Sequence, residues 1–223
     1  MGPGNSLARG PYCFILRPHK ACRRWLLLAL LSGLLSAEAG PGCCATRPPR
    51  PQTRGLHAFV LGASRGRLKG PWKRRAADVS RAILSESRLR GLDPVMLMAV
   101  IANESSFNPA AIGSHGEVGL MQIRPGTAEW IARIKKLPYK GRRTLLDPVQ
   151  NIRLGAAYMG LLRQRYGRDC RLILAAYNMG SASLERALAR RRSVNSYPCR
   201  VLKRYAGLRA ELRELRSGLR SRV

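Results

Sequence analysis

The sequence predicts a mainly α-helical domain. Apolar residues recur at intervals of three and four, the period of one face of an α-helix, in four segments. These segments are residues 76–89, 125–134, 148–166 and 171–177. Two Asp-Pro pairs, beginning at Asp93 and Asp147, have the order of a capping carboxylate followed by proline in the first helical turn. The stretch of about 150 residues that contains these signals is long enough for one hydrophobic core.

Residues 1–39 have the features of a cleavable signal peptide. Basic residues precede an apolar stretch over residues 25–35, and Ala37 and Ala39 have the small side chains of a cleavage site. The apolar stretch is about 11 residues long, whereas a helix that spans a bilayer needs roughly 20. We therefore expect an exported protein of the periplasm or cell envelope that meets the membrane only during export. Twin-arginine export and a lipid anchor are weaker alternatives.

Two further regions are expected after the signal peptide. Residues 40–74 are rich in proline, arginine and glycine and show little periodicity, which predicts a flexible linker. The folded domain is expected over residues 75–223 and ends in a basic amphipathic helix. The apolar face of that helix comprises Leu202, Tyr205, Leu208, Leu212, Leu215 and Leu219. We expect this face to pack on the domain, with a partner-binding or membrane-surface helix as the alternative.

Glu104 stands out because it lies on the apolar face of a predicted helix that begins at Asp93. At helical spacing it shares this face with Leu97, Val100 and Ile101. A carboxyl group against such a surface loses hydration in its charged form, so the pKa of Glu104 should rise. A raised pKa suits a general acid. The alternative is that Glu104 ends its helix partly exposed, as an ordinary surface glutamate.

The other acidic residues offer few competitors for that role, since the chain has only 12 Asp and Glu against 41 Lys and Arg. Asp93, Asp147 and Asp169 are expected at helix starts. Six more fall in arginine-rich helical patterns and are expected on solvated faces. They are Asp78, Glu86, Glu129, Glu185, Glu211 and Glu214. Glu117, in a glycine-bracketed loop, is the other carboxylate whose position suggests chemistry.

Three linked motifs give Glu104 a context. They are Glu104-Ser105-Ser106-Phe107-Asn108-Pro109, Gly119-Leu120-Met121-Gln122-Ile123 and Ala176-Tyr177-Asn178-Met179-Gly180. In this order and spacing the chain resembles the soluble lytic transglycosylase (SLT) family, bacterial enzymes that cleave peptidoglycan on a mainly helical, lysozyme-like fold with a substrate cleft. The resemblance covers roughly residues 75–208, including the segment 147–152 and Tyr197.

The resemblance implies a set of site residues. Glu104 is implied as the single catalytic acid and base. Met121 and Gln122 are implied to line the glycan cleft, Tyr177 and Asn178 to lie beside the carboxyl and the acetamido group of the sugar, and Tyr197 to close the site. Many relatives have a serine where this chain has Gly113, and Ser114, one place later, is the candidate for its role. Met179 and Glu117 also depart from the small residues usual at their positions.

The implied reaction breaks the β-1,4 bond between N-acetylmuramic acid and N-acetylglucosamine without water and gives a 1,6-anhydromuramoyl product. Glu117 supports an alternative, a lysozyme-type hydrolase that uses Glu104 and Glu117 as a carboxylate pair. A third class is a non-catalytic protein that binds polyanions or the cell wall. The resemblance implies no cofactor. His19, His57 and His115 are scattered and form no zinc-ligand spacing with cysteines.

The net charge of +29 favours polyanionic partners. Without residues 1–39 the chain has 36 basic and 11 acidic residues, which leaves +25. Peptidoglycan has carboxylates on its peptide stems and fits this charge. Nucleic acid is not expected, because the export signal opposes it and no aromatic residues interleave with the basic runs. A small domain of this kind suits general wall turnover, or local wall opening for a secretion, conjugation or flagellar apparatus.

Four cysteines remain after the predicted cleavage: Cys43, Cys44, Cys170 and Cys199. An oxidising envelope compartment permits disulfides. The resemblance brings the segments around Cys170 and Cys199 together near the cleft. A bridge between these two residues and a pair of free thiols are both left open.

Overall fold

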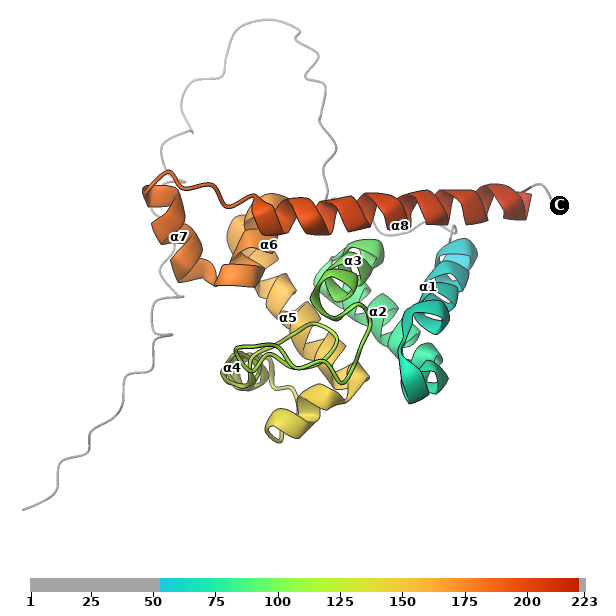
Figure 1. Cartoon of the computed structure of the whole chain (residues 1–223), viewed down its shortest axis with the longest axis horizontal. Coiled ribbons are helices and arrows are strands. Elements are labelled where there is room, and N and C mark those ends of the chain that lie inside the picture. The colour runs from blue at the N-terminus through green and yellow to red at the C-terminus, as the bar shows by residue number, and fades with distance from the viewer. Residues whose placement is uncertain (1–52, 221–223) are drawn as a thin grey trace, which may run out of the picture. The chain divides into compact units, whose positions relative to one another are not determined.

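The computed structural model describes residues 53–220 and consists of helices joined by short turns and one long loop (Figure 1). In chain order the helices are α1 (Thr53–Arg67), η2 (Gly70–Arg75), α2 (Ala76–Arg90), α3 (Pro94–Ser105), α4 (Pro125–Lys135), η3 (Arg142–Leu146), α5 (Pro148–Tyr166), α6 (Cys170–Met179), α7 (Ser181–Ala189) and α8 (Ser196–Arg220). The mainly helical prediction is confirmed. The predicted signal peptide, residues 1–39, lies outside the described residues. None of the described helices has the length and apolar character needed to span a bilayer.

The helix α3 forms the centre of the core. Every residue from Val95 to Ile101 is buried, so the helix is enclosed on all sides rather than on one face. Its start is fixed as the sequence predicted, because the Asp93 side chain accepts a hydrogen bond from the Val95 N–H at 2.8 Å and Pro94 occupies the first turn. At the other end, Ser106 and Phe107 have positive φ angles and turn the chain into the long loop.

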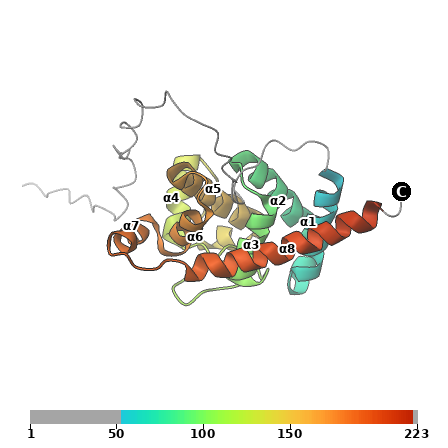
Figure 2. The ribbon, with the colours of Figure 1, turned by 90° about the horizontal axis from the view of Figure 1, so that it is seen from above.

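The helix α8 lies along α3 and continues past it to α1 (Figures 1 and 2). Its apolar stripe is turned toward the domain, where Val201, Leu208 and Leu212 are buried. Farther along, the Arg67 guanidinium of α1 donates to both carboxylate oxygens of Glu211 at 2.6 and 2.7 Å. Packing of this stripe on the domain is therefore confirmed for the described side chains, which do not include that of Leu219.

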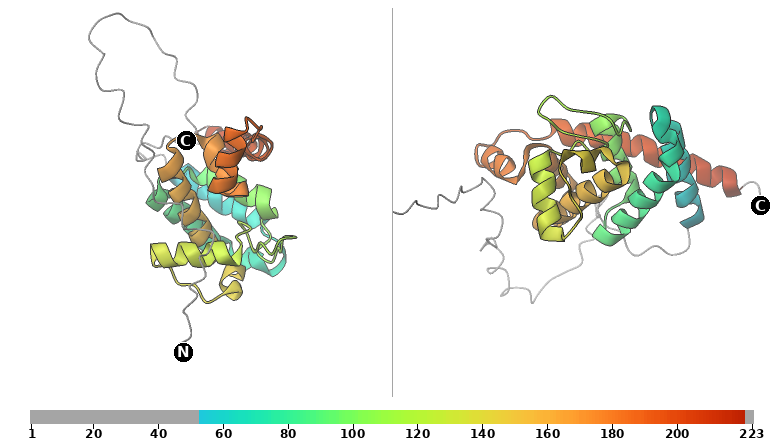
Figure 3. Two further views of the ribbon diagram at one scale, coloured as in Figure 1. Left: turned by 90° about the vertical axis from the view of Figure 1, so that its left-hand side faces the viewer. Right: turned by 90° about the horizontal axis from the view of Figure 1, so that it is seen from below.

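The linker prediction for residues 40–74 is wrong from residue 53 onward, because α1 and η2 lie there. The Phe59, Val60 and Ala63 side chains form one buried face of α1. The helix α1 packs against α2 and α8 (Figure 3). Glycine and arginine give the segment a weak intrinsic helix preference. Burial of this face against two other helices stabilises the helix in spite of that composition.

Glu86 also differs from its expected position on a solvated face. It is only 8% exposed, on the side of α2 that packs against α5. Its carboxylate is 3.4 Å from Arg90 Nε and 3.9 Å from Arg153 Nε. The arginine-rich pattern was correct, but the arginines lie at a helix interface and compensate a buried charge instead of facing water.

Candidate active site

Glu104 ends the buried helix α3, and its carboxyl is partly buried. The Tyr197 hydroxyl, from the first turn of α8, donates a hydrogen bond to Glu104 Oε1. Burial is the main cause that raises the pKa of Glu104, and the negative charge of Glu117 adds to it. Hydrogen bonds from Tyr197 and Asn103 and the positive charge of Arg200 act in the opposite direction without cancelling the rise. The carboxyl therefore holds its proton to a higher pH than an ordinary surface glutamate does.

Tyr197 is a direct partner of this carboxyl. Its side chain is 4% exposed, and burial together with the charge of Glu104 raises the pKa of Tyr197 well above its ordinary value. The phenol therefore stays protonated and acts as a donor at any physiological pH. The Arg200 guanidinium carbon, one helical turn farther along α8, lies 5.8 Å from the centre of the Tyr197 ring.

Tyr177 reaches the same place from α6. Its hydroxyl donates to the Met121 carbonyl oxygen at 2.8 Å, and its ring lies 5.5 Å from that of Tyr158. Burial raises the pKa of Tyr177 strongly, and the charge of Glu104 raises it further. The structure thus brings Glu104, Tyr177 and Tyr197 close together from three helices, and the roles that the resemblance implies for them at a sugar stay predictions.

The loop between α3 and α4, residues 106–124, is held by buried polar contacts. Asn151 of α5 is fully buried and makes three hydrogen bonds to the loop and its surroundings. Its side-chain oxygen accepts from the Met121 N–H at 2.8 Å, and its amide nitrogen donates to the carbonyl oxygens of Val118 at 2.8 Å and Leu145 at 2.9 Å. The Ser105 hydroxyl, next to Glu104, lies 2.8 Å from the Leu120 carbonyl oxygen. These contacts fix the loop relative to the catalytic candidate.

Met121 does not line a cleft with its side chain, so this prediction is wrong. The residue is fully buried, and its side chain packs so closely on Gly155 that a Cβ there would overlap the Met121 sulfur. The physical reason is the loop path, in which Asn151 and Tyr177 bind the Met121 backbone and turn its side chain into the core.

Gln122 is half-buried and also serves the loop. Its amide nitrogen donates to the carbonyl oxygens of Ala111 at 3.1 Å and Gly119 at 2.9 Å. Gln122 adopts a positive φ of 46°, a conformation uncommon for a residue with a side chain. The amide nitrogen is thus engaged by the protein, and contact with a sugar stays a prediction for this residue.

Glu117, the second candidate carboxylate, is held by its own loop. Its carboxylate accepts from Arg124 Nε at 2.8 Å and from the His115 N–H at 3.0 Å. Partial burial opposes the charged form of Glu117, but the hydrogen bonds from Arg124 and from the backbone outweigh it and lower the pKa. Glu117 is therefore a stable anion near Glu104, already paired with a cation.

Two predicted residues, Ser114 and Asn178, are exposed. The Ser114 hydroxyl lies 3.1 Å from Nδ1 of the neighbouring His115. Asn178 follows Tyr177 at the end of α6. Within residues 53–220 no hydrogen bond joins either of them to Glu104, and their sugar-binding roles stay predictions.

Sequence reasoning missed three residues that act on the site. Asn151 lies in the segment 147–152, which is part of the resemblance. The sequence near this asparagine does not indicate which distant backbone groups its side chain will hydrogen-bond to. Asn103, the neighbouring residue on α3, acts to lower the pKa of Glu104. Arg200 lies three residues after Tyr197, and this helical spacing could have indicated it.

The cysteine pair is not bridged. Cys170 is buried and Cys199 is exposed, and no disulfide joins the two. Of the two arrangements left open by the sequence, the structure has the unbridged one.

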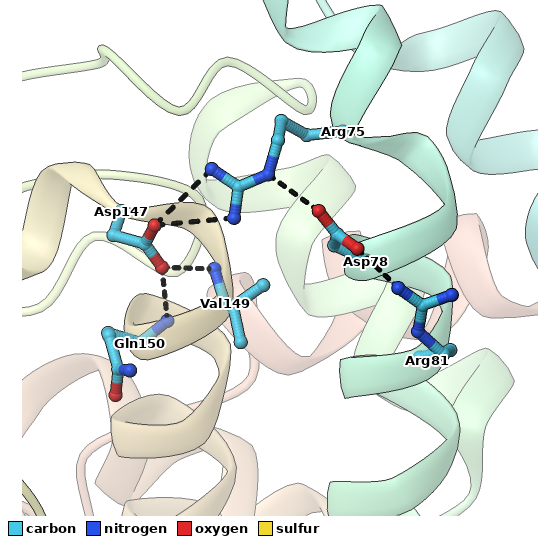
Figure 4. Close-up of polar contacts among 6 residues, drawn as sticks. All are labelled: Arg75, Asp78, Arg81, Asp147, Val149 and Gln150. Carbon is cyan, nitrogen blue, oxygen red and sulfur yellow. Dashed lines mark hydrogen bonds and ion pairs between the residues drawn. The ribbon is translucent and has the colours of Figure 1, made fainter.

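A polar cavity of about 370 Å³ lies between α2 and the start of α5 and shares no lining residue with the Glu104 site. Arg75 connects its two sides, with Nε 2.7 Å from Asp78 and Nη2 3.4 Å from Asp147 (Figure 4). Asp147 also caps α5 by accepting from the N–H groups of Val149 and Gln150. This network joins η2 and α2 to the start of α5.

Fold and site together define a helical, lysozyme-like domain with a partly buried glutamate at the end of a core helix. Residues 81–198 match the sequence profile of the transglycosylase SLT domain, and the chain belongs to that family. The fold class inferred from the motifs is confirmed.

Similar proteins include the putative soluble lytic murein transglycosylase of Haemophilus influenzae, 41% identical over 93 residues, which cover 42% of this chain and 16% of that protein. The soluble lytic murein transglycosylase of Escherichia coli K12 is 39% identical over 84 residues, 37% of this chain and 13% of the relative. The matched region is thus a small part of each relative. An inactive mutant of lytic transglycosylase Slt from Pseudomonas aeruginosa has a similar structure, with a TM-score of 0.55 and 28% identity over 64% of this chain and 25% of that one.

Proposed function

We propose that this protein is an exported peptidoglycan lytic transglycosylase that cleaves the β-1,4 bond between N-acetylmuramic acid and N-acetylglucosamine, with Glu104 as acid and then base. The observation that carries the proposal is the environment of the Glu104 carboxyl. This carboxyl is partly buried at the end of α3 and accepts a hydrogen bond from the Tyr197 hydroxyl. Membership of the SLT family and relatives named as lytic murein transglycosylases support the same substrate class.

The proposed reaction begins with protonated Glu104. Its proton passes to the glycosidic oxygen while the bond from that oxygen to the muramoyl anomeric carbon breaks, and N-acetylglucosamine leaves with a free hydroxyl. The anomeric carbon then carries oxocarbenium character. The Glu104 carboxylate takes the proton of the muramoyl carbon-6 hydroxyl as that oxygen bonds to the anomeric carbon. The 1,6-anhydro ring closes, Glu104 is protonated again and no water is consumed.

The ring closure explains why a single carboxylate is enough. The nucleophile is part of the substrate, so it attacks with the high effective concentration of an intramolecular reaction. We propose that Tyr177 lies beside the Glu104 carboxyl and the bound sugar, and that Asn178 contacts the acetamido group of that sugar. Ser114 and Gln122 are proposed to contact the glycan from the loop.

The hydrolytic alternative requires Glu117 to orient a water molecule. The pairing of Glu117 with Arg124 and with its own loop favours a structural role for this carboxylate instead. The products distinguish the two reactions, because hydrolysis leaves reducing ends and transglycosylation leaves anhydro ends. A Glu117→Gln variant that still forms anhydro ends would exclude the carboxylate pair.

Purified protein incubated with sacculi, followed by mass spectrometry of the soluble fragments, tests the proposal. The wild type should release anhydromuropeptides. Glu104→Gln should bind sacculi normally and lose at least about 100-fold of the release rate, as expected for removal of a general acid–base group. Exposed Glu129 of α4 provides the matched control, and Glu129→Gln should keep full activity. Equal release by Glu104→Gln would refute Glu104 as the acid and base, and no release by the wild type would leave only a wall-binding role.

The setting is proposed to be the periplasm or cell envelope, reached through the signal peptide predicted in residues 1–39. The high positive charge is proposed to attract the carboxylates of peptide stems. Local opening of the wall for a secretion, conjugation or flagellar apparatus is one proposed use of such a domain. A periplasmic extract that contains the shortened mature chain would support the export step.

A further inference from the structure

Arg200 carries an inference that rests on the proposed function. We propose that Arg200 is a positioning residue that acts through the Tyr197 ring to favour the ionised form of Glu104, so that this carboxylate can take a proton in the second half of the reaction. Arg200 forms no ion pair with the Glu104 carboxyl. In this proposal it does not contact the substrate either. It acts on Glu104 through Tyr197 and through its charge.

The geometry places the three groups in series. Arg200 lies one turn after Tyr197 on α8, and its guanidinium carbon is 5.8 Å from the Tyr197 ring centre. The Tyr197 hydroxyl donates to Glu104 Oε1. A cation over a phenol ring withdraws electron density and makes the hydroxyl a stronger donor. A stronger donor stabilises the carboxylate more than the neutral acid.

Charged and titratable groups interact with Glu104 from three neighbouring elements. Tyr197 and Arg200 come from α8, Tyr177 comes from α6, and Glu117 comes from the loop. Glu117 is negative and opposes ionisation of Glu104, while the two tyrosines are neutral at physiological pH. Asn103 contributes a neutral hydrogen bond. Arg200 is the positive charge in this set that acts on Glu104.

The proposed reaction explains why such a charge is useful. Burial and Glu117 favour protonated Glu104, which suits the first step. The second step needs the same group to exist as a carboxylate long enough to accept the carbon-6 proton. Burial alone would make that carboxylate too unfavourable. The Arg200 cation compensates part of the burial and keeps both forms accessible.

A titration that needs no activity tests the inference. The side-chain carboxyl carbon of Glu104, assigned by comparison with Glu104→Gln, can be followed by carbon-13 NMR in the whole chain as the pH is varied. Arg200→Met should move the midpoint of Glu104 to higher pH, because the ionised form loses its nearby cation. Arg200→Lys should restore most of the wild-type midpoint. Lys203→Met removes one exposed positive charge from the next turn of α8 and should leave the midpoint unchanged.

Dependence on the ring is tested by a double-mutant cycle. In a Tyr197→Phe background, Arg200→Met should shift the Glu104 midpoint less than it does in the wild type, since the hydroxyl that transmits part of the effect is absent. An equal midpoint in wild type and Arg200→Met would overturn the inference. So would equal shifts for Arg200→Met and Lys203→Met.

The pH profile connects the titration to catalysis. The basic limb of kcat/KM reports the group that must be protonated in the free enzyme. In Arg200→Met this limb should move to higher pH in step with the NMR midpoint. Inactivity of the wild type toward sacculi would refute the proposed function but leave the NMR result, and so the electrostatic part of the inference, intact. A shifted NMR midpoint with an unmoved basic limb would overturn the catalytic part.

Discussion

The Tyr205 hydroxyl donates a hydrogen bond to Asp93 Oδ2 at 2.7 Å, and this contact joins the middle of α8 to the N-cap residue of α3. Eight residues earlier on α8, Tyr197 donates to Glu104 at the opposite end of α3. Two tyrosines of one helix therefore hold both ends of the helix that carries the catalytic candidate. Because the two helices run in opposite directions, the position of α8 along α3 sets the contact between Tyr197 and Glu104.

Removal of the Tyr205 hydroxyl should destabilise the fold. Tyr205→Phe is expected to lower the free energy of unfolding by about 1.5–3 kcal/mol, the range for a hydrogen bond to a charged group. Urea unfolding measures the loss. Tyr166→Phe is the matched control, since the Tyr166 hydroxyl is buried without a hydrogen-bond partner and its removal should be neutral or stabilising. Similar losses in both variants would show that Asp93 is not a stabilising acceptor.

Replacement of Asn151 by aspartate should release the loop of residues 106–124. The carboxylate cannot donate to the carbonyl oxygens of Val118 and Leu145, so both lose this hydrogen bond and Val118 keeps the one from the Ile123 N–H, at a cost of at least about 2 kcal/mol. Hydrogen exchange of the Met121 amide should accelerate as well. Asn108→Asp makes the same chemical change where the side chain only accepts, from the Ala110 N–H, and should have little effect. Unaltered exchange in Asn151→Asp would refute the anchoring role.

Glu104→Gln should stabilise the protein increasingly as the pH rises. Burial raises the pKa of Glu104 above 4.5, so the folded state holds the proton more tightly than the unfolded state. The protonated carboxyl thus contributes its full stability below pH 4.5, and this contribution is lost as the pH rises through the folded-state pKa. Glutamine cannot ionise and still accepts from Tyr197.

Unfolding free energies of wild type and Glu104→Gln, measured by urea between pH 4 and 8, give this difference directly. It should be small at pH 4, grow with pH and then become constant. Glu129→Gln at an exposed site should give a constant difference throughout. A difference for Glu104→Gln that shrinks toward pH 8 would mean that the folded protein favours the charged carboxylate, contrary to the effect of burial.

Gly62→Ala tests the helix that replaces the predicted linker. An added Cβ at Gly62 meets nothing within 4 Å, so the substitution should stabilise α1 by about 0.5–1 kcal/mol. Gly119→Ala should instead destabilise by more than about 1 kcal/mol, because Gly119 has a φ of +80° and a Cβ would overlap the Asn151 amide. Thermal unfolding compares the two. No gain in Gly62→Ala would indicate that residues 53–67 contribute no helix to the folded state.

Local chemistry explains what could be predicted from the sequence. Asp93, Asp147 and Asp169 each cap a helix by accepting from backbone N–H groups two or three residues farther along, so a few neighbouring residues are enough to specify them. The apolar environment of Glu104 followed from its helical spacing for the same reason. Family motifs then indicated which aromatic residues would approach it.

Contacts between distant segments account for the errors. Residues 53–67 have a linker composition and became a helix because α2 and α8 offered an apolar surface to Phe59 and Val60. Met121 entered the core because Asn151, thirty residues away, binds its backbone. Glu86 lost its solvated position because an arginine of α5 approaches it.

The sequence by itself determined the helices α2 to α6 and α8, the aspartate caps and the motifs that indicate the family and the catalytic candidate, since each helix, cap and motif depends on residues within a few positions of one another. The tertiary structure alone decided how strongly Glu104 is desolvated, which tyrosine hydroxyl donates to it and which cation lies near the ring of that tyrosine. Hydration and charge depend on three-dimensional distances, and those were set when α8 packed along α3.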